Sequence, residues 1–423
     1  RMTEALESNS YDVLIIGGGA AGLMAAVLLA RQSSELKIAV LDGAKRLGAK
    51  ILISGGGRCN VTNVSVTAKD FSGGSRNVIK RTLKAFSAKQ TVQFFADLGV
   101  ELHEEEHGKL FPDSNKARTV LEALIESAES QGVHLLTDQR VESIQKQDDT
   151  FSVGTQQAEF KCTKVIMATG GRSIPKTGSD GFGYELAKSL GHSITETVPA
   201  LAPMLLDGEF HEGLSGIALE TELTLRTKSS KPEKFFGSML WTHFGISGPV
   251  VLNVSRHWHA ADLNGEGPIV SANFLPELNS QSFEGALLQQ GQSNANSTIR
   301  KFLSNQLPNR FVDDMLQISE ISVELRFSDL KKEQRKKLVK NLTEYQLPIS
   351  NSRGFGFAEA TAGGIPLSEI NPSTMESRCC PGLYLVGEIL DVDGKLGGYN
   401  FQWAWSSAAV AASGVALINN DEG

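Results

Sequence analysis

The chain has 423 residues, of which 40% are hydrophobic and 21% charged, and its formal net charge is −7. One hydrophobic core rarely serves so long a chain, so we expect more than one domain, and the composition excludes a disordered or fibrous protein. The acidic balance disfavours nucleic acid and anionic membranes as partners, and we expect neither.

The cysteines and the leader indicate the compartment. Cys59, Cys162, Cys379 and Cys380 show no CxxC or metal-ligand spacing, so we expect no metal site and thiols buried as small apolar residues in a reducing compartment. The leader Arg1–Ser10 is polar and lacks the apolar stretch of a signal peptide. No apolar run reaches the roughly 18–20 residues that cross a bilayer. These features predict a soluble, cytoplasmic protein.

The first predicted elements form a strand–helix–strand unit. Tyr11–Ile16 is a short apolar run typical of a buried parallel strand. Gly17–Gly22 (GGGAAG) follows it and leads into an alanine- and leucine-rich stretch of helical composition. Lys37–Asp42 (KIAVLD) is a second short strand. The ordered chain therefore begins with a βαβ unit.

Helical and strand patterns then alternate. Gly43–Asn63 is rich in glycine and polar residues, which predicts a long functional loop. Helical patterns follow at Arg81–Leu98 and Ala117–Gln131. Three further strands are predicted at Val133–Asp138, Arg140–Gln145 and Thr163–Ala168.

The pattern changes at residues 196–351, which we interpret as an inserted domain on the substrate side. Leu223–Trp241 alternates apolar with polar residues around a polar turn and predicts an antiparallel hairpin. More strands are predicted at Pro268–Leu275 and Ile321–Phe327, and helices at Ser297–Gln317 and Asp329–Leu342. The domain is thus expected to be mainly antiparallel β, with a helical part at about 283–345.

The last segment returns to strand and helix patterns. Pro381–Glu388 is a strand that ends in Gly387-Glu388, and Gly394–Asn400 (GKLGGYN) precedes an apolar helix at Phe401–Leu417. We predict an α/β fold in which both chain ends, residues 11–195 and 352–423, form a Rossmann-like domain.

A dinucleotide fingerprint lies in the first unit. Gly17, Gly19 and Gly22 have the GxGxxG spacing between a strand and a helix, and Asp42 ends the next strand. Gly17 permits a tight turn, Gly19 lets the backbone approach a pyrophosphate, and Gly22 allows close packing of the helix on the strand. Asp42 accepts hydrogen bonds from the adenosine ribose hydroxyls. This combination predicts an adenine dinucleotide.

The C-terminal segment favours FAD over NAD. The helix after Gly394–Asn400 places a positive helix end where it stabilises charge on a reduced flavin, and the Glu388 carboxylate is suited to ribityl hydroxyls. A capped helix with an ordinary turn is the alternative interpretation. A site at each end of the chain makes FAD the predicted cofactor.

Four long motifs resemble a known family. They are Lys50–Asn63 (KILISGGGRCNVTN), His107–Ala117, Thr242–Pro249 and the C-terminal block Gly356–Ala408. The chain resembles the BaiN/YhiN-like flavoprotein family, some members of which are aminoacetone-oxidase-like FAD-binding enzymes. The resemblance covers nearly the whole chain.

The resemblance implies which positions hold FAD, along the cofactor from its ADP half to its flavin ring. They are Gly17, Gly19, Ala20, Ala21, Gly22, Asp42 and Gly43 at the ADP half, Val141 at the adenine, Lys50, Ser54, Gly55, Gly56, Arg58 and Asn60 along the centre, Thr169 and Gly170 over the cofactor, and Gly387, Glu388, Gly397, Gly398, Tyr399 and Asn400 around the flavin. One departure is Asp391–Leu396, where relatives often keep an acidic-proline-glycine turn, so an altered flavin-side pocket is expected.

Several residues have both a chemical and a structural interpretation. His243 and Tyr399 are the candidate catalytic residues, although a structural, hydrogen-bonded His243 is the more common case, and His107 has the same ambiguity. Cys59 has no partner at disulfide-reductase spacing. The basic run Lys331–Lys340 is more typical of a solvated helix face than of an RNA contact.

These observations predict an FAD-dependent oxidoreductase. The leading hypothesis is a reductase of a small organic substrate, with NADH or NADPH as a transient electron donor, although no second fingerprint provides a dedicated nucleotide site. The alternatives are a flavin oxidase of a small amine that produces peroxide, a flavin-bearing RNA-modification or RNA-binding protein, and a protein in which FAD is only structural. Substrate identity and oligomeric state stay open.

Overall fold

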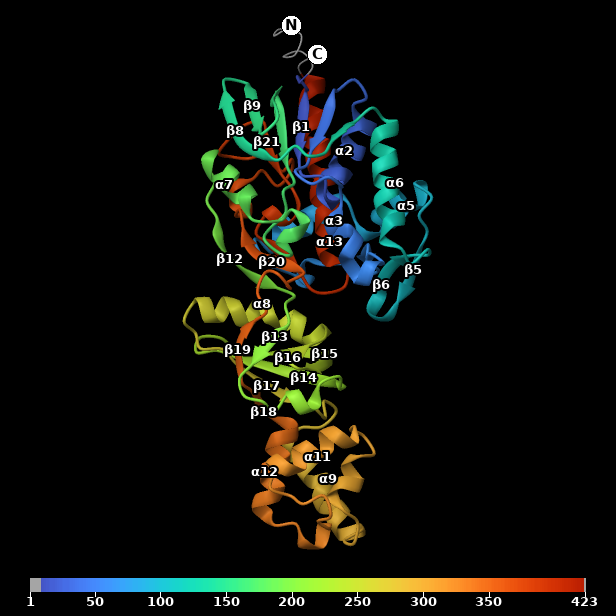
Figure 1. The fold of residues 1–423 in the computed structure, drawn as a ribbon, viewed down its shortest axis with the longest axis vertical. Coiled ribbons are helices and arrows are strands. Elements are labelled where there is room, and N and C mark those ends of the chain that lie inside the picture. The colour runs from blue at the N-terminus through green and yellow to red at the C-terminus, as the bar shows by residue number, and fades with distance from the viewer. Residues whose placement is uncertain (1–8, 422–423) are drawn as a thin grey trace. The chain divides into compact units, whose positions relative to one another are not determined.

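The computed structural model describes residues 9–421 and side chains up to residue 417, so most of the predicted leader lies outside the described residues. The chain forms two compact units. Unit 1 comprises the described residues up to Val198 and from Glu359 onward, and unit 2 comprises Pro199–Ala358. Figure 1 shows the elements of both units along the chain.

A five-stranded parallel sheet forms the centre of unit 1. In spatial order its strands are β21 (Leu383–Leu385), β11 (Lys164–Met167), β1 (Val13–Ile16), β2 (Ile38–Leu41) and β7 (His134–Leu136). Every residue of β1 and β2 is buried, which explains their unbroken apolar runs. Because β21 pairs with β11, the C-terminal segment completes a sheet begun at the N-terminus, and the predicted Rossmann-like fold class is confirmed.

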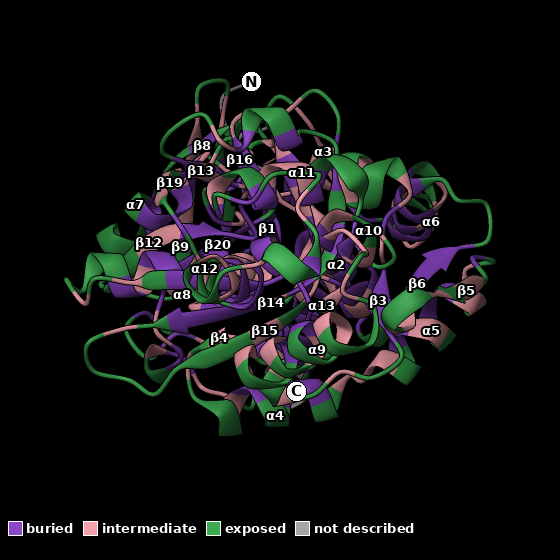
Figure 2. Cartoon of the chain, turned by 90° about the horizontal axis from the view of Figure 1, so that it is seen from below, coloured by how far each residue is buried: buried purple, intermediate pink, exposed green. Residues whose placement is uncertain are grey.

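Two helices from opposite ends of the chain pack together beside this sheet. α2 (Ala20–Gln32) contacts α13 (Tyr399–Asp421), and Figure 1 shows the blue and red helices side by side. α6 (Ala117–Ser130) contacts α2 as well. Alanines on α2 and α13 permit close approach, while Trp403 and Trp405 fill the core, whose buried residues are purple in Figure 2.

Shorter elements complete unit 1. Its remaining helices are α3 (Ala49–Ile53), α4 (Arg76–Ala85), α5 (Ala88–Asp97) and α7 (Phe182–Ser189). A three-stranded antiparallel sheet contains β8 (Val141–Gln147), β9 (Thr150–Thr155) and β10 (Glu159–Cys162), and another contains β3 (Thr62–Asn63), β6 (Lys109–Pro112) and β5 (Leu102–Glu105). Two-stranded pairs join β4 (Phe71–Gly73) to β22 (Val392–Gly394) and β12 (Thr195–Ala200) to β20 (Ala360–Gly364).

Two predictions in this unit were wrong in detail. The helical pattern predicted around Arg81–Leu98 begins earlier, at Arg76, and is divided into two helices, because Ser87 forms a reciprocal capping box with Gln90 and starts α5. The loop predicted at Gly43–Asn63 contains α3 and a 3₁₀ turn at Ser54–Gly57.

Unit 2 is built on a seven-stranded antiparallel sheet. In spatial order its strands are β18 (Tyr345–Leu347), β17 (Ile269–Asn273), β14 (Ala218–Arg226), β15 (Glu233–Thr242), β16 (Gly245–Ser247), β13 (Met204–Leu206) and β19 (Ile349–Ser352). α8 (Pro249–Leu263) packs against β14, β15 and β16. The predicted hairpin is β14 and β15.

The segment between β17 and β18 forms a group of helices. They are α9 (Ser280–Ser293), α10 (Ile299–Leu303), α11 (Asn309–Ile318) and α12 (Lys332–Thr343). The helix predicted at Ser297–Gln317 is divided into α10 and α11, since Pro308 precedes α11 and cannot continue the preceding helix. The strand predicted at Ile321–Phe327 is absent from the described structure, which has only one isolated bridge there, between Thr298 and Arg326.

All four cysteines are free. Three of them are buried, but Cys379 is exposed, so the expectation of a buried thiol was wrong at that position. Within residues 9–421, the structure has no helix that combines the length and apolarity needed to span a membrane.

Candidate cofactor site

The three fingerprint glycines differ in what surrounds them. Gly17 has φ +106°, and a Cβ at this position would lie 2.3 Å from the Ala168 carbonyl oxygen. A Cβ on Gly22 would lie 1.8 Å from the carbonyl oxygen of Gly17. A Cβ on Gly19 would meet nothing within 4 Å. Gly19 also precedes the first turn of α2, which contains no acidic residue. The β1–α2 turn is therefore tightly packed at Gly17 and Gly22 but open at Gly19, in front of the N-terminus of α2. An entering pyrophosphate requires such an open position.

The predicted ribose and adenine residues lie together beside this turn. The Asp42 carboxylate accepts hydrogen bonds from the N–H groups of Gly18 (2.7 Å) and Ala44 (2.8 Å). The Asp42 carbonyl accepts one from Gln139 N–H (2.8 Å), which brings the start of β8, with the buried Val141, next to Gly43. The carboxylate is thus held by backbone donors and keeps lone pairs for ribose hydroxyls.

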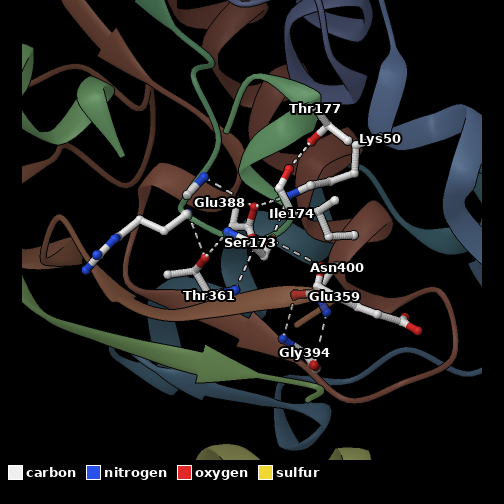
Figure 3. A network of polar contacts seen from close by, with 11 residues as sticks. Lys50, Ser173, Ile174, Thr177, Glu359, Thr361, Glu388, Gly394 and Asn400 are labelled. Carbon is white, nitrogen blue, oxygen red and sulfur yellow. Dashed lines mark hydrogen bonds and ion pairs between the residues drawn. The ribbon is translucent and has the colours of Figure 1, made fainter. Parts of the chain in front are cut away.

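A second polar centre surrounds Glu388, as Figure 3 shows. One carboxylate oxygen of Glu388 accepts from Gly171 N–H (3.2 Å) and pairs with Lys50 Nζ (3.0 Å). The other accepts from Thr361 N–H (2.7 Å) and from Ser173 Oγ (3.3 Å). Lys50 Nζ also donates to Ser173 Oγ (2.7 Å). The side chains of Lys50 and Glu388 are 27% and 18% exposed, so a ligand can reach this pair.

Three residues of this centre were missed by sequence reasoning. They are Gly171, Ser173 and Thr361, and the Thr361 hydroxyl further accepts from the N–H groups of Arg172 and Ser173. A glycine pair adjoins them in each segment, Gly170-Gly171 shortly after β11 and Gly363-Gly364 shortly after Thr361, and these pairs were the available signal.

The loop before α13 is closed by its own side chains. Asn400 Oδ1 accepts from Gly394 N–H (2.8 Å), and Asn400 Nδ2 donates to the Gly394 carbonyl (3.0 Å). A Cβ on Gly398 would lie 2.5 Å from the Thr62 carbonyl oxygen, and one on Gly397 would approach the Tyr399 ring. Gly387 is held by α13, because its N–H donates to Ser407 Oγ and its carbonyl accepts from Trp403 Nε1. Asn400, Gly398 and Gly387 therefore position the helix N-terminus.

The central residues line the α3 segment. Ser54 Oγ donates to the Ile51 carbonyl (2.7 Å), and Gly55 and Gly56 both have positive φ. A Cβ on Gly56 would meet nothing within 4 Å. Arg58 binds Glu105 (2.6 Å) and stacks 4.1 Å from the Phe111 ring centroid.

The Asn60 amide joins this segment to the loop before α13. With its NH₂ facing the carbonyls of Leu110 and Thr62, its oxygen accepts from Gly398 N–H (3.1 Å). Asn60 therefore contributes to the site through the backbone that it holds.

Two buried hydroxyls near the Glu388 centre lack partners among the described residues. They are Thr169 Oγ1, just after β11, and the Tyr184 hydroxyl on α7. Burial, together with the charge on Glu388, raises the pKa of Tyr184, so this phenol is protonated at neutral pH. Unsatisfied buried donors beside an open glycine turn fit a dinucleotide that supplies phosphate and hydroxyl oxygens, and the residues present fit FAD.

The candidate catalytic residues lie in different units. Tyr399, in the first turn of α13, packs its ring edge-on against Phe71, and burial above all raises its pKa, with Asp70 adding to the effect. His243 is exposed in the β15–β16 turn of unit 2 and packs against Phe244. Cys59 is buried, and burial raises its pKa to about 12, so its thiol is protonated at neutral pH and is a poor redox nucleophile.

Comparison with known proteins places the chain in a family. Residues 11–414 match the family described as HI0933-like protein Rossmann domain. The chain is 34% identical to a 3-dehydro-bile acid delta(4,6)-reductase of Clostridium scindens over 95% of this chain and 98% of that protein. It is 33% identical to a ribosomal RNA dihydrouridine synthase of Escherichia coli over 95% and 97% of the two chains.

A solved structure supports the fold. The quinol fumarate reductase subunit FrdA of E. coli superimposes with a TM-score of 0.51 at 15% identity, covering 98% of this chain and 71% of that one. The family match and the reductase relative together show an FAD-dependent oxidoreductase. The chain belongs to the HI0933-like Rossmann domain family.

Proposed function

We propose that the protein reduces a carbon–carbon double bond of a small organic substrate with electrons from NADH or NADPH. The observation that carries this proposal is the likeness, along nearly the full length of both chains, to the relative named as a bile acid reductase. The protonated state of Cys59 is in keeping with it, because a thiol-based disulfide reductase needs a thiolate.

The residues of unit 1 support a role in binding and in electrostatics. FAD, when bound, supplies the hydride chemistry. The long helix α13 begins at Tyr399, after the loop that Asn400 closes through its hydrogen bond with Gly394. The first turn of α13 has no acidic residue, so its N-terminal N–H groups favour negative charge. Glu388 is held by two backbone N–H groups and Lys50, which keeps its carboxylate ready for hydroxyl groups of the cofactor.

Reduction of a double bond also consumes a proton. Tyr399 is a proposed donor, because burial keeps its phenol protonated at neutral pH. His243 is the other proposed donor, and its exposed ring in unit 2 is accessible to substrate or solvent.

An anaerobic absorbance titration tests the proposal. We expect the flavin bands of the purified protein to bleach on addition of NADH or NADPH, with one nucleotide acting faster. A flavin that stays oxidised with both nucleotides but is reduced by a small amine would contradict the reductase and support the oxidase. A flavin that no donor reduces would indicate a structural cofactor.

A second candidate is an enzyme that reduces uridine in ribosomal RNA. Two relatives carry the name ribosomal RNA dihydrouridine synthase, at 33% identity each, and dihydrouridine is uridine with its 5,6 double bond reduced. The exposed Lys332, Lys336 and Lys340 on α12 suit phosphate contacts, whereas the overall charge of −7 opposes them. Dihydrouridine analysis of ribosomal RNA from a deletion strain decides this case: an unchanged content would exclude it.

A further inference from the structure

We propose that Arg353 in unit 2 binds a carboxylate group of the substrate. Arg353 follows β19, and its backbone N–H donates to the Pro203 carbonyl (2.9 Å). Its guanidinium carbon lies 3.5 Å from the ring centroid of Phe357 and 4.4 Å from that of Phe244. Contact with two aromatic rings restrains the guanidinium plane and leaves its N–H edge as the binding surface.

The charge on Arg353 has no protein partner. Within the described part of the chain, no carboxylate pairs with this guanidinium and no side-chain hydrogen bond engages it. Two other arginines of unit 2 differ: Arg300 binds both oxygens of Asp313, at 2.5 and 3.0 Å, and Arg335 pairs with Glu284 at 3.1 Å. A half-buried cation without a counter-charge favours an anionic ligand, and its fork of N–H donors matches a carboxylate.

The surroundings of Arg353 suit a small amphipathic molecule. Phe357 is 52% exposed, and a Cβ on Gly354 or on Gly356 would meet nothing within 4 Å. His243 packs its ring against the same Phe244, with ring centroids 5.2 Å apart. An apolar ring surface next to one cation fits an acid with a hydrophobic body.

A carboxylate explains these features better than a phosphate does. Phosphate groups carry up to two charges and are usually held by several cations or by a helix N-terminus. Here a single guanidinium contacts two aromatic rings. The inference deepens the proposed function by naming the substrate class, and it rests on that function only in assigning the carboxylate to the reduced substrate.

Direct binding to the FAD-loaded protein, without any nicotinamide nucleotide, tests the site. The probes are 3-phenylpropionate and its neutral analogue 3-phenylpropanamide, followed by ligand-observed NMR titration. We expect the wild type to bind the carboxylate about ten-fold more tightly than the amide, as a charge-assisted hydrogen bond predicts. Arg353→Ala should bring the two affinities to parity. Arg353→Lys should keep part of the preference, because it keeps the charge but loses the fork.

Matched variants separate this role from a structural one. Arg326 is exposed in unit 2 and forms no ion pair with the described residues, and Arg326→Ala should retain the full preference. Phe357→Leu should reduce the preference by loosening the stack. Flavin content and the thermal midpoint verify the fold of each variant.

Two results would overturn the site: parity of the two probes in the wild type, or equal behaviour of the Arg353→Ala and Arg326→Ala variants. Tighter binding of inorganic phosphate than of the carboxylate would overturn the assignment to carboxylates. Because no turnover is measured, failure of NADH and NADPH to reduce the flavin refutes the proposed function and leaves this test intact.

Discussion

At the scale of single residues, the fingerprint glycines are glycines for different reasons. Gly17 and Gly22 face backbone oxygens at distances that no side chain tolerates, so they are needed for the fold itself. Gly19 faces open space, so it is needed only by what enters that space. The same distinction applies at the other end of the site, where Gly398 faces the Thr62 carbonyl and serves the packing of the chain.

Gly19→Val should therefore give folded protein without flavin. The new side chain meets no protein atom at its Cβ but occupies the space that a pyrophosphate needs. We expect a thermal midpoint close to that of the wild-type apoprotein and loss of the flavin absorbance. Gly22→Val is the contrasting variant and should fail to fold, because its Cβ would lie 1.8 Å from a carbonyl oxygen. A yellow Gly19→Val protein with full FAD content would refute the assignment of this turn.

At the scale of elements, α13 is connected to its neighbours by one buried glutamine. Gln402 is 0% exposed, and its Oε1 accepts from the hydroxyls of Thr62 (2.6 Å) and Thr91 (2.9 Å). Its Nε2 donates to the Phe86 carbonyl (3.1 Å) and to Ser406 Oγ (3.0 Å). This network joins α13 to β3 and α5, and so holds the helix whose N-terminus borders the candidate cofactor site.

Gln402→Leu should destabilise the protein by at least about 2 kcal/mol, because it leaves several buried polar groups unpaired. Denaturant unfolding followed by tryptophan fluorescence measures this loss, and two of the four tryptophans, Trp403 and Trp405, lie in unit 1. The control is Gln93→Leu, an exposed position on α5, for which we expect a change within about 0.5 kcal/mol. Equal stabilities of the two variants would contradict the role of the network.

A buried histidine makes the stability of α8 depend on pH. His259 Nε2 lies 2.7 Å from Ser352 Oγ, and burial lowers the pKa of His259, an effect that Asp262 only partly offsets. Because the pKa of His259 is lower in the folded protein than in the unfolded chain, the unfolded chain binds this proton at a higher pH than the folded protein does. Stability is therefore full above about pH 6.5 and falls as the pH drops below it toward the folded pKa.

The thermal midpoint should accordingly fall between about pH 7.5 and pH 5.5, and His259→Gln should reduce that fall. Glutamine can still hydrogen-bond to Ser352 but carries no titrating proton. Identical pH profiles of the two proteins would assign the effect to other groups.

At the scale of the whole molecule, two separate hydrophobic cores divide the tasks. All the predicted FAD contacts lie in unit 1, whereas His243 and Arg353 lie in unit 2. Unit 2 is one continuous segment with its own core, which includes Trp241, Phe274 and Phe311. Unit 1 requires both chain ends, because β21 and α13 complete its sheet and core.

The fragment Pro199–Ala358 should therefore fold alone and bind no FAD. Circular dichroism should show a cooperative thermal transition, and equilibrium dialysis against FAD should show no uptake. A fragment that is unfolded, or one that retains flavin, would contradict this division.

Sequence patterns predicted the local parts of this architecture well. The fingerprint turn, the hairpin and the C-terminal helix were recognised because glycine spacing, alternation and small-residue composition act over a few neighbouring residues. Errors arose where a short signal interrupted a longer pattern. Ser87 with Gln90 begins a new helix, and Ile321–Phe327 has strand-like composition but no partner strand among the described residues.

By itself, the sequence predicted the glycine-rich turn between β1 and α2 and determined the family, since both depend on residue types at short spacings. Only the tertiary structure decided how distant groups meet. Lys50 and Glu388 form an ion pair although they are 338 positions apart in the sequence. The ring of Phe244 contacts the guanidinium of Arg353, the residue that follows β19. Such contacts depend on how separate segments pack, because hydrogen bonds and ring stacking act through space over a few ångströms and leave no periodic trace along the chain.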